Sequence, residues 1–77
     1  MLNNIEKEYI YVSSDGSSKD VRALNTEYLI NALAKCYRNI FSQTSSEEFN
    51  KYVTNIQNIE VEIKQRIKKF REEKENN

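Results

Sequence analysis

The longest apolar pattern in the chain runs over residues 49–70. At about 100° per residue, its apolar side chains fall within about a third of the circumference of one helix. Only Glu60 interrupts this stripe, which consists of Phe49, Tyr52, Val53, Ile56, Ile59, Ile63, Ile67 and Phe70. A helix of this length needs its apolar face covered. We therefore expect the rest of the chain to pack against it.

A second helical pattern precedes this stripe. Its apolar side chains cover nearly half of the helix circumference, which is a wider face than a single partner helix can bury. These side chains are Leu29, Ile30, Leu33, Ala34, Cys36, Tyr37, Ile40 and Phe41. Asn25 is a typical helix cap, and Ser45 with Glu48 has the spacing of a capping box. The pattern predicts helices over residues 26–41 and 46–71, joined by a short loop that makes them antiparallel.

The N-terminal part has the pattern of a β-hairpin over residues 8–23. Residues 9–12 are rich in strand formers, and Asp15-Gly16 is a strong signal for a two-residue type I′ turn. Residues 19–23 then form the return strand. This register places Ile10 opposite Val21 on an inward face, and it turns Tyr9 and Tyr11 outward. Tyr9 lies opposite Arg22, which favours a cation–π contact.

These elements predict one α+β domain over residues 1–77, mainly helical, with a β-hairpin packed on an antiparallel helical pair (ββαα). Residues 1–7 and 72–77 are expected to be flexible ends. The first helix is expected to reach back only to about Glu60. Ile63, Ile67 and Phe70 then overhang it. The hairpin is the first expected cover for these three residues, and a second copy of the chain is the alternative.

Composition narrows the functional classes. The 77 residues include 12 basic and 12 acidic side chains, one cysteine and no histidine. The absence of histidine removes the usual general base and most zinc sites, so we expect neither enzymatic activity nor a cofactor. Cys36 lies within an apolar seam and is expected to be a small buried residue. No apolar run is long enough to span a bilayer and no signal peptide is present, which predicts a cytoplasmic protein without membrane contact.

Three groups of residues are candidate binding surfaces. Aromatic and basic side chains expected on the outside form a candidate partner-binding group: Tyr9, Tyr11, Arg22 and Tyr28. Lys64, Lys68 and Arg71 share one flank of the long helix and form a candidate phosphate-contacting strip. The alternative for this strip is a solvated face with pairs four residues apart, namely Glu62–Arg66, Lys68–Glu72 and Lys69–Glu73. The third group is Ile63, Ile67 and Phe70.

Glu60 is the one charge within the long stripe. It is expected to be a boundary residue paired with Lys64 one turn later. The alternative is a specificity element in the seam of an oligomer.

The order of strand, Asp15-Gly16 turn, second strand and a helix opening with Thr26, Leu29, Asn31 and Ala32 resembles a loose class of small phage and prophage accessory proteins. The resemblance covers roughly residues 9 to 40. It implies a mobile-element accessory protein. Together with the lack of catalytic groups, the surplus apolar face and the outward tyrosines, it leads us to expect a non-enzymatic protein that binds a host protein or ribonucleoprotein, for example as an inhibitor of a CRISPR nuclease. Two alternatives stay open: an oligomeric nucleotide- or nucleic-acid-binding protein that uses the basic strip, and a structural or regulatory oligomer subunit.

Overall fold

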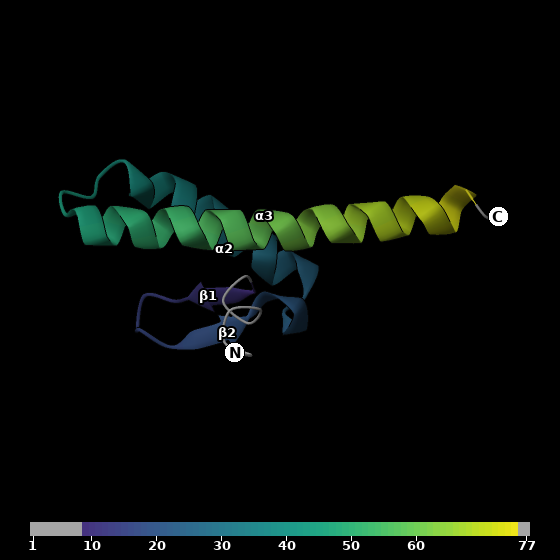
Figure 1. Ribbon diagram of the computed structural model, residues 1–77, viewed down its shortest axis with the longest axis horizontal. Helices are drawn as coiled ribbons and strands as arrows, with labels where there is room; N and C mark the ends of the chain where they lie inside the picture. Colours follow the sequence, from purple (N-terminus) through teal and green to yellow (C-terminus); the bar gives the residue numbers. More distant parts are fainter. Residues whose placement is uncertain (1–8, 76–77) are drawn as a thin grey trace, which may run out of the picture.

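The computed structural model describes residues 9–75 and shows a two-stranded antiparallel sheet followed by two long helices (Figure 1). The elements are β1 (Ile10–Val12), β2 (Ser18–Asp20), the 3-10 helix η1 (Val21–Ala23), α2 (Thr26–Ile40) and α3 (Ser46–Glu75). This order confirms the predicted ββαα α+β fold. The expected flexible end at residues 1–7 lies outside the described residues.

Both helices begin at the predicted caps. The Asn25 side-chain oxygen accepts a hydrogen bond from the Tyr28 N–H at 2.7 Å, and the Ser45 hydroxyl accepts one from the Glu48 N–H at 3.2 Å. The predicted end of the second helix at residue 71 is wrong, because α3 continues to Glu75, and residues 76–77 of the expected flexible end lie outside the described residues. Neither Gly nor Pro interrupts this region, so nothing in the sequence stops the helix at residue 71.

The core lies between α2, α3 and the inner face of the hairpin. Its buried apolar side chains come from all of these elements: Tyr11, Val21, Leu29, Ala32, Cys36, Ile40, Ile56 and Ile59. Cys36 is buried, as predicted. In Figure 1, α2 crosses behind α3 in the opposite direction, and the hairpin lies on one side of the pair. The C-terminal part of α3 extends beyond both.

The turn of the hairpin differs from the predicted type I′ turn. A type I′ turn needs positive φ at both central residues, but Gly16 at +89° is the one residue with positive φ among residues 9–75. The Gly16 N–H donates to the Ser13 carbonyl, and the Ser13 N–H donates to the Ser17 carbonyl, both at 2.9 Å. This pattern is typical of a type I turn followed by a left-handed glycine.

The changed turn shifts the strand register by one residue. Tyr11 pairs with Lys19, and Ile10 pairs with Asp20, so the predicted pairing of Ile10 with Val21 is wrong. A one-residue slip exchanges the two faces of a strand. Tyr11 is therefore inside, only 6% exposed, whereas Ile10 and Val12 are half-buried.

The return strand is also shorter than predicted. It ends at Asp20, whose carboxylate accepts a hydrogen bond from the Arg22 N–H at 2.9 Å and caps η1. Residues 21–23 therefore turn in a 3-10 helix instead of continuing the strand. This turn inserts Val21 into the core, where it is fully buried, and leads the chain into α2.

Candidate protein-docking surface

The docking surface depends on how α3 is fastened to the hairpin. The Asn55 side chain makes two hydrogen bonds to the backbone of Val12: its oxygen accepts one from the Val12 N–H at 3.0 Å, and its amide group donates one to the Val12 carbonyl at 2.9 Å. The Asn58 amide donates to the Ile10 carbonyl at 2.8 Å. These two asparagines, 2% and 8% exposed, therefore satisfy the edge of β1 that faces away from β2.

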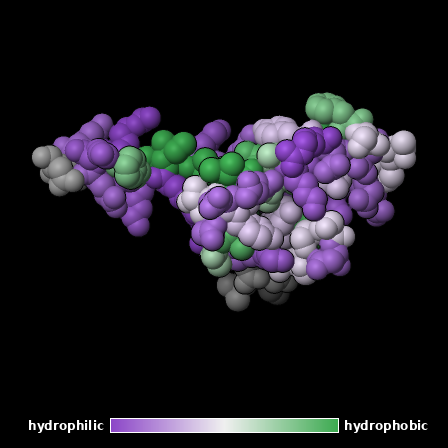
Figure 2. Space-filling model, turned by 180° about the vertical axis from the view of Figure 1, so that it is seen from behind, coloured by the Kyte–Doolittle hydropathy of each residue, from purple (hydrophilic) through white to green (hydrophobic). Residues whose placement is uncertain are grey.

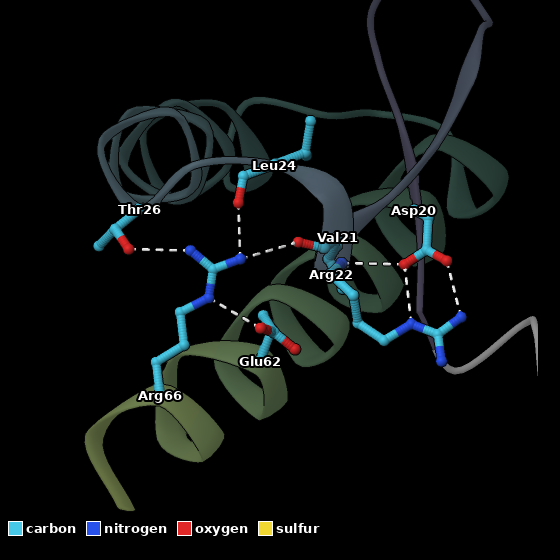
Figure 3. A network of polar contacts seen from close by, with 7 residues as sticks. All are labelled: Asp20, Val21, Arg22, Leu24, Thr26, Glu62 and Arg66. Carbon is cyan, nitrogen blue, oxygen red and sulfur yellow. Dashed lines mark hydrogen bonds and ion pairs between the residues drawn. The ribbon is translucent and has the colours of Figure 1, made fainter. Parts of the chain in front are cut away.

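About two turns beyond Asn58 along α3, Arg66 fastens the helix to the connection between the hairpin and α2 (Figure 3). Its guanidinium donates to the Leu24 carbonyl at 2.6 Å, the Val21 carbonyl at 3.3 Å and the Thr26 hydroxyl at 2.8 Å. It also pairs with Glu62 at 2.7 Å. The predicted Glu62–Arg66 pair is thus confirmed, but as one part of a larger network that holds the start of α2.

The bond between Arg66 and Thr26 shows where α2 stops covering α3. The start of α2 reaches the level of Arg66, so the predicted limit near Glu60 is wrong. Ile63 is half-buried and packs against the core. Ile67 and Phe70 are 52% and 60% exposed, so the expectation that the hairpin covers them is wrong. The hairpin packs instead on the flank of α3 that carries Asn55 and Asn58.

We call the surface around these residues the overhang surface. It is a groove of about 340 Å³ lined by Thr26, Ile63, Arg66, Ile67 and Phe70. Figure 2 shows hydrophobic side chains along this projecting part of α3, with hydrophilic ones on either side. The groove is therefore an apolar strip on a helix that neither α2 nor the hairpin covers.

Basic side chains surround the apolar strip. Residues 63–71 contain five basic residues and no acidic one: Lys64, Arg66, Lys68, Lys69 and Arg71. Within the described range 9–75, no ion pair joins an acidic side chain to any of these except Arg66. The expected pairs Lys68–Glu72 and Lys69–Glu73 are therefore not formed. Lys64, Lys68 and Arg71 are exposed on one flank of the strip, as expected.

The proposed tyrosine group does not form one outward surface. Tyr11 is buried, and its ring meets the ring of Tyr28 edge-on at 6.4 Å. Tyr9 is half-buried, and the predicted contact with Arg22 is confirmed, with the guanidinium carbon 3.9 Å from the ring centre. Tyr28 and Arg22 are exposed. The change of strand register explains why Tyr11 faces the core.

Glu60 has a different partner from the expected one. The Tyr37 hydroxyl donates a hydrogen bond to the Glu60 carboxylate, which links α2 to α3, and no bond to Lys64 is formed. The same contact raises the pKa of the Tyr37 hydroxyl, because the carboxylate accepts its proton in a hydrogen bond. Tyr37 itself is exposed, although its place in the helical pattern predicts a core-facing residue.

Other chemistry is sparse in the part of the chain that the structure describes. No group of three or more His, Cys, Asp or Glu side chains in residues 9–75 is arranged to hold a metal ion. Burial raises the pKa of the Cys36 thiol, which lowers its reactivity. No described helix combines the length and the apolar character that crossing a membrane requires.

Comparison with known proteins leaves the surface as the main guide to function. The sequence matches no protein-family model, and no curated protein and no solved structure is significantly similar to it.

Three important residues were not singled out from the sequence in these roles: Asn55, Asn58 and Arg66. The signal was present, because Asn55, Asn58, Glu62 and Arg66 follow one another at helical spacing on one flank of the apolar stripe. Polar side chains on such a flank are usually solvated. Here β1 and η1 lie against this flank of α3 and cover its polar side chains.

Proposed function

We propose that this protein is a non-enzymatic binding protein that occupies a partner macromolecule through its overhang surface. The observation that carries the proposal is the exposure of Ile67 and Phe70 on a projecting helix whose base is fastened by Arg66. Exposed apolar strips rimmed by polar residues are typical of protein-interaction sites. A preformed groove also avoids part of the ordering cost of binding.

The resemblance to small phage and prophage proteins supports a more specific form of this proposal. In that form the partner is a host protein or ribonucleoprotein of a defence system, such as a CRISPR nuclease. Binding without catalysis suits such a role, because the inhibitor has only to occupy the partner.

A nucleotide or nucleic acid is the second candidate ligand. The observation in its favour is that Lys64, Lys68 and Arg71 lie exposed without an acidic partner in the described chain. Phosphate binding through such side chains weakens steeply with salt.

The test is affinity capture from lysate with the wild-type full chain, one double variant and one single variant. Ile67→Ser/Phe70→Ser removes the apolar strip, and Phe41→Ser removes an equally apolar side chain, 86% exposed, at the other end of the helical pair. We expect a protein captured from lysate by the wild type to be retained by the Phe41 variant and lost by the double variant. All three chains should melt within a few degrees, because the altered side chains are exposed.

Capture that is equal for all three chains would contradict the proposal, because it would place binding elsewhere. Enrichment of nucleic acid that survives the double variant would favour the second candidate.

A further inference from the structure

The overhang surface carries an inference about the chemistry of its partner, which rests on the proposed function. We propose that it binds an amphipathic helix whose apolar stripe is flanked by acidic side chains. The shape of the groove and the charge along it favour such a helix, and the same charge opposes a second copy of this chain.

The shape favours a helix as the occupant. Ile63, Ile67 and Phe70 project from one side of α3 at helical spacing and form a ridge about 10 Å long. Thr26 at the start of α2 and the fastened Arg66 provide a second wall, so the strip is a groove instead of a flat patch. A groove of this kind suits a helix that inserts apolar residues at i, i+3 or i+4 and i+7. An extended strand would need a sheet edge, which the overhang surface lacks.

The basic side chains along the overhang surface favour a partner helix with acidic side chains on the flanks of its apolar stripe. Residues 63–71 carry five basic side chains and no acidic one. Arg66 lines the groove but is already paired with Glu62, whereas Lys64, Lys68 and Arg71 are exposed along one side of the strip without an acidic partner in the described chain. Acidic side chains on the incoming helix would meet these charges at the rim, where complementarity speeds association and selects the partner.

The same charge opposes a second copy of this chain. Pairing two overhang surfaces, parallel or antiparallel, brings the basic segment 63–71 of one copy against that of the other. Like charges along a helical seam are unfavourable. The apolar strip in turn argues against nucleic acid, since phosphate contacts do not require Ile67 and Phe70 to be exposed side by side.

The experiment uses three labelled synthetic peptides that share one leucine stripe over about three to four helical turns. Their flanking positions carry Glu, Gln or Lys. We expect the Glu peptide to bind the full chain tightest and the Lys peptide not to bind. Ile67→Ser/Phe70→Ser should abolish binding of the Glu peptide.

Two variants that each remove two positive charges test whether the basic flank contributes to binding. Lys68→Gln/Arg71→Gln should weaken binding of the Glu peptide about three- to tenfold, the size expected for two exposed ion pairs. Lys35→Gln/Arg38→Gln removes the same charge from α2 and should change the affinity less than about twofold. Equal affinity for the Glu and Gln peptides, or equal losses in the two variants, would overturn the proposal.

Two further measurements decide between occupants. Tighter binding of duplex DNA or a cyclic dinucleotide than of the Glu peptide, with competition between them, would overturn the inference in favour of a phosphate ligand. A light-scattering mass of two chains that falls to one in the Phe70→Ser variant would overturn it in favour of self-association. A protein captured through Ile67 and Phe70 that the Glu peptide does not displace would refute this inference alone and leave the proposed function standing.

Discussion

Asn55 pairs through its side-chain amide with the backbone N–H and carbonyl of Val12, at 3.0 and 2.9 Å, across 43 positions of the chain. A helix side chain thus takes the place of a neighbouring strand along the outer edge of β1. Unpaired strand edges are sites of aggregation, so this contact also protects the hairpin. It depends on a buried amide that presents one acceptor and one donor to the same residue.

Replacement of Asn55 should therefore be costly. We expect Asn55→Ala to lower the free energy of unfolding by about 2–3 kcal/mol, because two hydrogen bonds are lost and buried backbone groups are left unpaired. In a domain of this size that corresponds to a melting temperature lower by roughly 10–20 °C. Urea unfolding followed by circular dichroism measures it. Asn50→Ala, an exposed change on the same helix, is the control, and a similar loss in both variants would contradict the role of Asn55.

Arg66 offers a test of geometry at constant charge. Its guanidinium donates to two carbonyls and a hydroxyl while it pairs with Glu62, a set that the single ammonium group of lysine cannot reproduce. We expect Arg66→Lys to cost about 1–2 kcal/mol of unfolding free energy, and hydrogen exchange to accelerate around residues 21–26. Arg71→Lys, at an exposed position, should change stability by less than about 0.5 kcal/mol. Unchanged exchange in the Arg66 variant would show that the network does not hold the start of α2.

The hairpin should weaken in acid. Hydrogen bonds from the hydroxyl of Ser13 and from the backbone and hydroxyl of Ser17 hold the pKa of Asp15 well below its usual range. The side chain and backbone of Arg22 lower the pKa of Asp20. A carboxylate with a lowered folded-state pKa stabilises the fold above its unfolded pKa of about 4, and this contribution is lost as the pH falls through the folded value.

The amide resonances of residues 10–20, followed by NMR, are the measure of this effect. They should shift toward unfolded values between about pH 4 and the acid limit of the titration. In the Asp15→Asn/Asp20→Asn variant the hairpin should be weaker at neutral pH and should respond less to acid. An identical acid response in the two proteins would mean that other carboxyl groups control it.

Cys36 should be inert while the protein is folded. It is 2% exposed, and burial raises the pKa of its thiol, so little thiolate is present and reagents have no access. We expect labelling with a disulfide reagent to be at least about a hundredfold slower in buffer than in denaturing urea, because it requires opening of the α2–α3 core. Comparable rates in the two conditions would show that α2 opens readily.

Local signals were enough for the helices. Asn25 and Ser45 cap them as the sequence predicts, because a cap requires only residues two or three positions away. The end of α3 was predicted wrongly, because no local signal marks it. A charged segment such as residues 72–75 can be a flexible tail or a helical one, and here the helix continues.

The hairpin register could not be predicted from the Asp15-Gly16 signal alone. The same dipeptide fits a two-residue type I′ turn and a longer turn with one left-handed glycine. Ser13 and Ser17, whose side chains bond each other at 2.7 Å and both bond Asp15, accompany the second arrangement. The difference of one residue was sufficient to move Tyr11 from the expected surface into the core.

The pattern of apolar and polar residues alone established the ββαα order, the antiparallel helical pair and the buried state of Cys36, because these follow from periodicity and local capping. Tertiary structure alone decided which flank of α3 receives the hairpin and how far α2 extends along it. Both depend on long-range hydrogen bonds, from Asn55 to Val12 and from Arg66 to Leu24, whose donors and acceptors are far apart in the chain. Those contacts leave Ile67 and Phe70 exposed beside a basic flank.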